Sequence, residues 1–122
     1  LQRATDAAGG QFDVIVDDGL HASHHQQVSL GYLFPYLAPR GIYFVEDLHY
    51  QPAHSEIPDH TTTRQVLKRF LDTGIVSSPA MTPEEQHALE QSIASIRFYD
   101  SLKRPKHRDL TSDALAVIQK RG

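Results

Sequence analysis

Two short apolar runs, each closed by acidic residues, dominate the hydrophobic pattern of the first half of the chain. The first run covers Phe12 to Val16 and is followed by Asp17-Asp18-Gly19. The second covers Gly41 to Val45 and is followed by Glu46-Asp47. Runs of this length are typical of buried strands in a parallel sheet. Because a helix-length segment separates them, the pattern predicts a βαβ unit with a right-handed crossover.

The remaining pattern alternates between helical and extended segments. Thr82 can cap a helix, Pro83 suits the first helical position and Glu85 completes a capping box. The expected elements are, in chain order, a helix over 1–8, a central helix that opens near His21, a helix over 61–71 capped by Gly74, a short helix from 82 to about 92, and a strand over 93–102. Residues 114–120 fit either a strand or a helix by pattern alone.

Four carboxylates follow the two predicted strands. Asp17 and Asp18 end the first strand, and Glu46 and Asp47 end the second. Ligands of open α/β sheets bind outside the carboxyl ends of parallel strands, so these acids are expected at one edge. A hard divalent cation such as magnesium, which prefers oxygen ligands, would relieve their repulsion. The alternative is that the acids cap helices or face solvent.

Histidines surround both acidic turns. His21 follows the first turn, and its near-neutral intrinsic pKa suits a general base. His21, His24 and His25 could instead form a zinc cluster, but the spacing lacks a third, distant ligand of evident kind. His21 and His25 would share a helix face if both are helical; His25 either packs within the helix or has a functional role. His49 follows the second acidic turn and is a candidate for substrate contact.

Composition narrows the classes of function. The chain of 122 residues suits one domain, and its net charge of −3 gives no reason to expect nucleic acid or a membrane surface as partner. The basic stretch Lys103 to Arg108 is short and lacks interleaved aromatic residues. There is no cysteine and no apolar run of membrane-spanning length. We therefore expect a cytoplasmic protein with a small-molecule partner.

A family resemblance rests on motifs between Phe12 and Tyr50. In chain order these motifs are Asp17-Asp18-Gly19-Leu20-His21, His25-Gln26, Leu33-Phe34-Pro35, Pro39-Arg40-Gly41 and Glu46-Asp47-Leu48. They resemble the DDGSH…HQ…LFP…PGG…EDL pattern of class I S-adenosylmethionine-dependent methyltransferases of the macrolide-sugar O-methyltransferase and cephalosporin-hydroxylase-like kind. Leu20 stands where serine is usual, and Arg40 where glycine is usual.

The resemblance implies roles for individual residues. It makes Asp18, Glu46 and Asp47 ligands of Mg²⁺ and His21 the general base. Asp17, the weakest ligand candidate, is expected to bond backbone amides of its turn and is assigned to cofactor binding. His49 and His25 are assigned to substrate binding.

The resemblance also implies a fold. The fold class is α/β: the C-terminal half of a Rossmann-like methyltransferase fold, with parallel strands and a C-terminal antiparallel hairpin that makes 114–120 a strand. The glycines contain no G-x-G spacing, so residues 1–122 are expected to form a single partial domain that lacks the N-terminal cofactor-binding half. An open sheet edge would then favour a homo-oligomer.

The expected function is metal-dependent transfer of a methyl group from S-adenosylmethionine, bound by the full-length parent, to a hydroxyl of a sugar or secondary metabolite. By itself the fragment is expected to be inactive. Two alternatives stay open. One is a non-catalytic α/β assembly module, and the other is a metal-dependent hydroxylase or hydrolase that uses the same acids and histidines.

Overall fold

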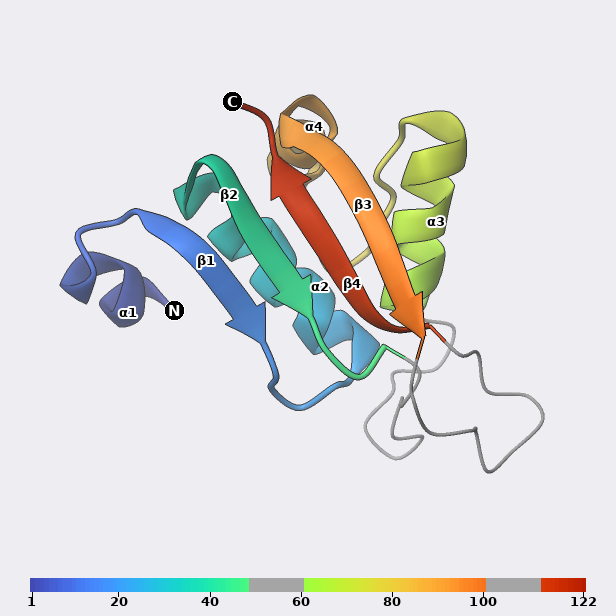
Figure 1. The fold of residues 1–122 in the computed structure, drawn as a ribbon, viewed down its shortest axis with the longest axis horizontal. Coiled ribbons are helices and arrows are strands. Elements are labelled where there is room, and N and C mark those ends of the chain that lie inside the picture. Colours follow the sequence, from blue (N-terminus) through green and yellow to red (C-terminus); the bar gives the residue numbers. More distant parts are fainter. Residues whose placement is uncertain (49–60, 101–112) are drawn as a thin grey trace.

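The computed structural model describes residues 1–48, 61–100 and 113–122 (Figure 1). Its elements are α1 (Gln2–Ala7), β1 (Phe12–Asp17), α2 (Ser23–Leu33), the 3-10 turn η1 (Phe34–Tyr36), β2 (Leu37–Val45), α3 (Thr63–Thr73), α4 (Pro83–Ser92), β3 (Ile93–Asp100) and β4 (Asp113–Lys120). In these ranges no helix is long and apolar enough to cross a membrane.

The strands form one mixed sheet in the order β1-β2-β4-β3. β1 and β2 are parallel, whereas β4 runs antiparallel to both β2 and β3. The predicted βαβ unit and C-terminal hairpin are therefore confirmed. Asp17 pairs with Val45, so β1 and β2 end at the same level and the turns that follow them are neighbours.

Helices α2, α3 and α4 cover one face of this sheet (Figure 1). The alternation of strand residues explains why, since every second side chain points toward the helices. Burial follows that alternation: on this face the sheet contributes Tyr43, Val45, Ile96, Ala116 and Ile118, which join Leu30, Phe34, Val66, Leu67 and Leu89 from the helices and η1 in one apolar core. The core fixes α2 against the strands whose ends carry the acidic turns.

The opposite side of the sheet, hereafter the helix-free face, carries the other half of the alternation. Val14 and Val16 on β1 are 53% and 54% exposed, and Tyr99 on β3 is 48% exposed. A cavity of about 280 Å³ lies over Arg97 and Val117 on this face. In the described part of the chain β1 pairs with β2 alone, so one edge of β1 is open as well.

Local signals define the helix boundaries. Thr82 and Glu85 form the predicted capping box at the start of α4, and Gly74 closes α3 in the left-handed conformation, with φ of 74°. A second capping box, between Thr62 and Gln65, starts α3. Both helices therefore begin where a threonine side chain accepts a bond from an otherwise unpaired backbone amide.

Three sequence-based boundaries were wrong. α3 covers Thr63–Thr73 and not 61–71, because Thr62 caps it. α2 begins at Ser23 and not at His21, because His21 adopts a left-handed φ of 65° that no α-helix accommodates. His21 and His25 therefore do not share a helix face. β2 begins at Leu37, before Gly41, since Leu37 already pairs with Phe12 of β1. Residues 49–60 and the basic stretch Lys103 to Arg108 lie outside the described residues.

Candidate active site

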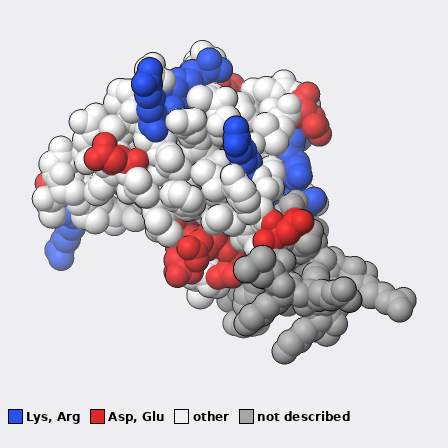
Figure 2. Space-filling view, in the orientation of Figure 1, with Lys and Arg blue, Asp and Glu red and all other residues white. Residues whose placement is uncertain are grey.

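Three predicted site residues converge beyond the ends of β1 and β2. Asp18 follows β1, His21 precedes α2 and Asp47 follows β2, and one ligand atom from each lies within 4.8 Å of the others. Asp18 is exposed, whereas His21 and Asp47 are partly buried. Figure 2 shows acidic side chains gathered at this end of the sheet. The parallel pairing of two strands has thus placed distant residues side by side.

His21 and Asp47 form the inner part of the cluster. Nε2 of His21 lies 3.3 Å from Oδ2 of Asp47, and Nδ1 of His21 is buried with no hydrogen-bond partner in the described ranges. Both residues adopt positive φ, 65° for His21 and 53° for Asp47. Such conformations cost L-residues on the order of 1–2 kcal/mol and persist where the surrounding structure enforces them. Of the three non-glycine residues with positive φ in the described ranges, two are these neighbours; the third is Arg40 in β2, with φ of 67°.

Asp17 points elsewhere and supports the first acidic turn. Its Oδ1 accepts a hydrogen bond from the amide of Gly19 at 3.3 Å, which is the expected bond to the turn. Burial raises the pKa of Asp17, against the lowering effects of the Gly19 amide and His21. Burial and the nearby Asp17 carboxylate also raise the pKa of Tyr43 far above its ordinary value. Neither Oδ2 of Asp17 nor the Tyr43 hydroxyl has a hydrogen-bond partner of ordinary geometry in the described part of the chain.

The other predicted site residues are placed differently. Glu46 is half-buried, and its carboxylate is not among the clustered ligand atoms. Its backbone is tied in, since its amide donates to the carbonyl of Asp17 at 3.0 Å. His25 is exposed on α2 and stacks against His24, with ring centroids 4.1 Å apart. His49 lies outside the described residues.

The clustered groups fit a hard divalent cation. Two carboxylates supply the oxygen ligands that Mg²⁺ prefers. Ligand atoms on opposite sides of Mg²⁺ lie about 4 Å apart, because each bond is about 2 Å long. Since Asp18 and Asp47 already lie within 4.8 Å, modest side-chain movement would let them share one ion while His21 stays beside it.

No protein-family model matches the sequence. It is 34% identical over 99 residues to the 8-demethyl-8-alpha-L-rhamnosyl tetracenomycin-C 2'-O-methyltransferase of Streptomyces olivaceus. This alignment covers 76% of this chain and 26% of that protein. It is 46% identical over 39 residues to the demethylmacrocin O-methyltransferase of Streptomyces fradiae, covering 32% of this chain and 10% of that protein. The chain thus spans about a quarter or less of these relatives.

A solved structure shares the fold. The MycE methyltransferase from the mycinamycin biosynthetic pathway, in complex with Mg, SAH and mycinamycin VI, matches with a TM-score of 0.64 at 22% identity, over 97% of this chain and 28% of that one. The fold and the sequence relatives agree. Over part of their length, the chain resembles sugar O-methyltransferases.

Two residues beside the acidic turns were missed by sequence reasoning. Gln26 on α2 is 2% exposed, and its Nε2 donates to the backbone carbonyl of Glu46 at 3.3 Å. Tyr43 on β2 is fully buried beside Asp17. The signal for Gln26 was its place in the His25-Gln26 motif, where the histidine was chosen. The signal for Tyr43 was strand alternation, which puts it on the same face as Val45.

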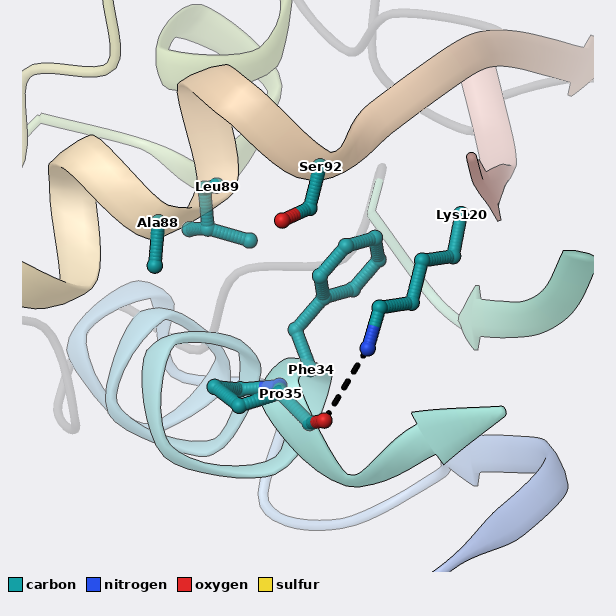
Figure 3. A pocket seen from close by; sticks show the side chains of 6 residues that line it. All are labelled: Phe34, Pro35, Ala88, Leu89, Ser92 and Lys120. Carbon is teal, nitrogen blue, oxygen red and sulfur yellow. Dashed lines mark hydrogen bonds between the residues drawn. The ribbon is translucent and has the colours of Figure 1, made fainter. Parts of the chain in front are cut away.

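Two cavities lie beside the apolar core. One of about 330 Å³ lies under the first acidic turn, between β1 and α2, and is lined by Asp17, Asp18, Gly19 and Tyr43 together with apolar residues. The other, of about 140 Å³, lies between η1, α4 and Lys120 of β4 (Figure 3). There the Lys120 ammonium donates to the carbonyls of Pro35 at 3.0 Å and Leu37 at 2.7 Å, and burial lowers its pKa. Lys120 therefore secures the start of β2 and is not part of the acidic cluster.

Proposed function

We propose that this chain forms the metal-binding and proton-accepting part of an S-adenosylmethionine-dependent O-methyltransferase. The acceptor would be a hydroxyl of a sugar or secondary metabolite. The observation that carries the proposal is the convergence of Asp18, His21 and Asp47 at the ends of two parallel strands. The sugar O-methyltransferase relatives support the same reaction class.

Each residue has a proposed task. Asp18 and Asp47, with Glu46 as a third ligand, would hold Mg²⁺. The ion would lower the pKa of a bound substrate hydroxyl. His21, held by Asp47, would accept the proton from that hydroxyl as the oxygen attacks the methyl group. Methyl transfer of this kind depends on in-line positioning more than on covalent catalysis.

The cofactor and the substrate need further groups. Asp17 is proposed to face S-adenosylmethionine, and His25 and His49 to contact substrate. The 122 residues contain no G-x-G spacing, so we propose that they form a partial domain of a cytoplasmic parent enzyme and that the parent supplies the cofactor-binding half. We also propose that the chain forms homo-oligomers and does not bind nucleic acid.

A non-catalytic assembly module is the second candidate. The open edge of β1 and the half-exposed Val14 and Val16 favour it, because unpaired edges and apolar patches are association surfaces. An assembly module would have no use for the acidic cluster as a metal site, so metal binding separates the two candidates.

Titration of the chain with Mn²⁺ and Mg²⁺ by calorimetry tests the proposal. We expect one site per chain, weakened at least tenfold in Asp18→Asn and Asp47→Asn, since each variant removes a charged ligand. Asp13→Asn, which changes an exposed acid at the start of β1, is the matched control and should bind as the wild type does. Equal affinity in all four proteins, or no binding to the wild type, would reject the metal site.

In the full-length enzyme, His21→Ala should leave Mn²⁺ affinity largely intact while lowering turnover about 10²–10⁴-fold, the usual scale for a lost general base. A variant that lost metal and activity together would reassign His21 to the ligands.

A further inference from the structure

Gln26 is buried in the first turn of α2, yet only one of its two side-chain amide atoms forms a hydrogen bond in the described residues. Nε2 donates to the carbonyl of Glu46 at 3.3 Å, whereas Oε1 is buried with no hydrogen-bond partner in the described residues. Burying an amide with an unsatisfied acceptor costs free energy that an apolar side chain would avoid. Stability of the helix therefore does not explain a glutamine here.

The carbonyl that Gln26 binds belongs to the peptide group between Glu46 and Asp47. Because that group is planar, it turns as a unit, and its rotation changes φ of Asp47. Asp47 has a φ of 53°, in a region that L-residues other than asparagine, aspartate and histidine rarely occupy. A bond to the Glu46 carbonyl holds the peptide in the orientation that this φ requires.

The rest of the turn is held by backbone bonds. The Glu46 amide donates to the Asp17 carbonyl at 3.0 Å, and the Leu48 amide donates to the Ala114 carbonyl at 3.1 Å. These bonds tie the ends of the turn to β1 and β4. The bond from Gln26 acts between them, on the peptide that leads into Asp47, and links it to the helix that directly follows His21.

We propose that Gln26 is a positioning residue: its hydrogen bond to the Glu46 carbonyl sets the left-handed backbone of Asp47 and so aims the Asp47 carboxylate at Asp18 and His21. The inference rests on the proposed metal site for its functional meaning. Its structural part, the control of φ at Asp47, stands independently of any ion.

The neighbouring Gln27 provides a matched control. It is also fully buried on α2, but it bonds the Thr61 carbonyl at 2.7 Å through Nε2 and accepts from the Ser78 hydroxyl through Oε1. Both of its amide atoms are used, and neither reaches the acidic turns. Gln26→Met and Gln27→Met remove the same amide from adjacent buried positions and keep a similar side-chain volume.

The test measures Mn²⁺ affinity, the melting temperature and φ of Asp47 for the wild-type chain and both variants. For Gln26→Met we expect about tenfold weaker Mn²⁺ binding, at the lower end of the 10–100-fold losses seen when groups that orient metal ligands are removed. We expect little loss of thermal stability and, in metal-free NMR, a backbone coupling that places Asp47 outside the left-handed region. For Gln27→Met we expect the larger fall in melting temperature, with Mn²⁺ affinity and φ of Asp47 unchanged.

The outcomes separate this inference from the proposed function. If the wild type binds no Mn²⁺, the proposed metal site is rejected. The comparison of φ of Asp47 between wild type and Gln26→Met still tests the positioning role of Gln26. A Gln26→Met chain that keeps φ of Asp47, or a Gln27→Met chain that weakens Mn²⁺ binding equally, would overturn the inference. Should Gln26→Met not fold, Gln26→Glu replaces it, because an ionised carboxylate keeps the shape but cannot donate to the Glu46 carbonyl.

Discussion

His21 and Asp47 show how single residues set the geometry of this site. Each occupies left-handed backbone next to a strand end, and each turns its side chain toward the other at 3.3 Å. Aspartate and histidine both occupy this conformation more often than most other L-residues. Strained backbone of this kind is often found at functional sites.

Tyr43 leads to a pH-dependent prediction at the same scale. Its folded pKa is raised by burial and by Asp17, while in the unfolded chain tyrosine titrates near pH 10. Above about pH 10 the folded state therefore binds more protons than the unfolded state, so stability falls as pH rises. Tyr43→Phe removes the effect: the difference in unfolding free energy between variant and wild type should be flat below about pH 9 and then grow by at most about 1.4 kcal/mol per pH unit. Urea denaturation at pH 7, 9, 10 and 11 measures it; parallel curves for the two proteins would contradict the assignment.

At the level of whole elements, the helices differ in what fixes their position. α3 and α4 both begin at a threonine capping box, and their starts are fixed by local hydrogen bonds and not by packing. The N-cap residue of α2 is Ala22, which makes no side-chain capping hydrogen bond. Its position is instead set by the core contacts of Leu30 and by the bonds of Gln27. The bond of Gln26 links α2 to the second acidic turn.

Gly74 provides the prediction for an element. Gly74 ends α3 with a left-handed φ of 74°, and a Cβ added there would meet no atom within 4 Å. A substitution at this position therefore tests backbone strain without a steric clash. Gly74→Ala should lower the unfolding free energy by about 1–2 kcal/mol. Gly74→Asn should lose less, because asparagine tolerates the left-handed region. Equal losses in the two variants, measured by urea denaturation with unchanged slopes, would argue against strain as the cause.

At the scale of the whole molecule, helices cover only one face of the sheet. Three helices bury one face of the sheet, while the helix-free face and the outer edge of β1 are open in the described part of the chain (Figure 1). Parallel strands such as β1 and β2 are normally covered on both faces. In the chain by itself, a second copy is the available cover.

Sedimentation of the 122-residue chain should therefore show a dimer or a larger species. Val16→Lys places a charge on the helix-free face, where Val16 is 54% exposed, and should shift the distribution toward monomer. Val28→Lys, which changes a 43% exposed residue on α2, is the control and should leave it unchanged. A wild-type chain that stays monomeric at high concentration would remove the homo-oligomer from the proposal.

The sequence by itself determined the elements and the edge of the sheet where the site forms. Alternation and capping are local, so the strands Phe12–Asp17 and Ile93–Asp100 and the helix start at Thr82 could be predicted from neighbouring residues. Parallel pairing of the first two strands then brought the acidic turns together, and the motif resemblance selected the residues. The hairpin strand at the C-terminus needed that resemblance, because its pattern fitted helix and strand equally.

Tertiary structure decided the details that give the site its geometry. The bond from Gln26 to the Glu46 carbonyl and the proximity of Tyr43 to Asp17 join segments that are distant in sequence. Strand alternation predicts the face on which Tyr43 lies, but which atoms meet there, and the left-handed backbone of His21, depend on how α2 and β2 pack on the shared core. The sequence therefore placed the chemistry at one edge of the sheet, and packing determined which atoms face each other there.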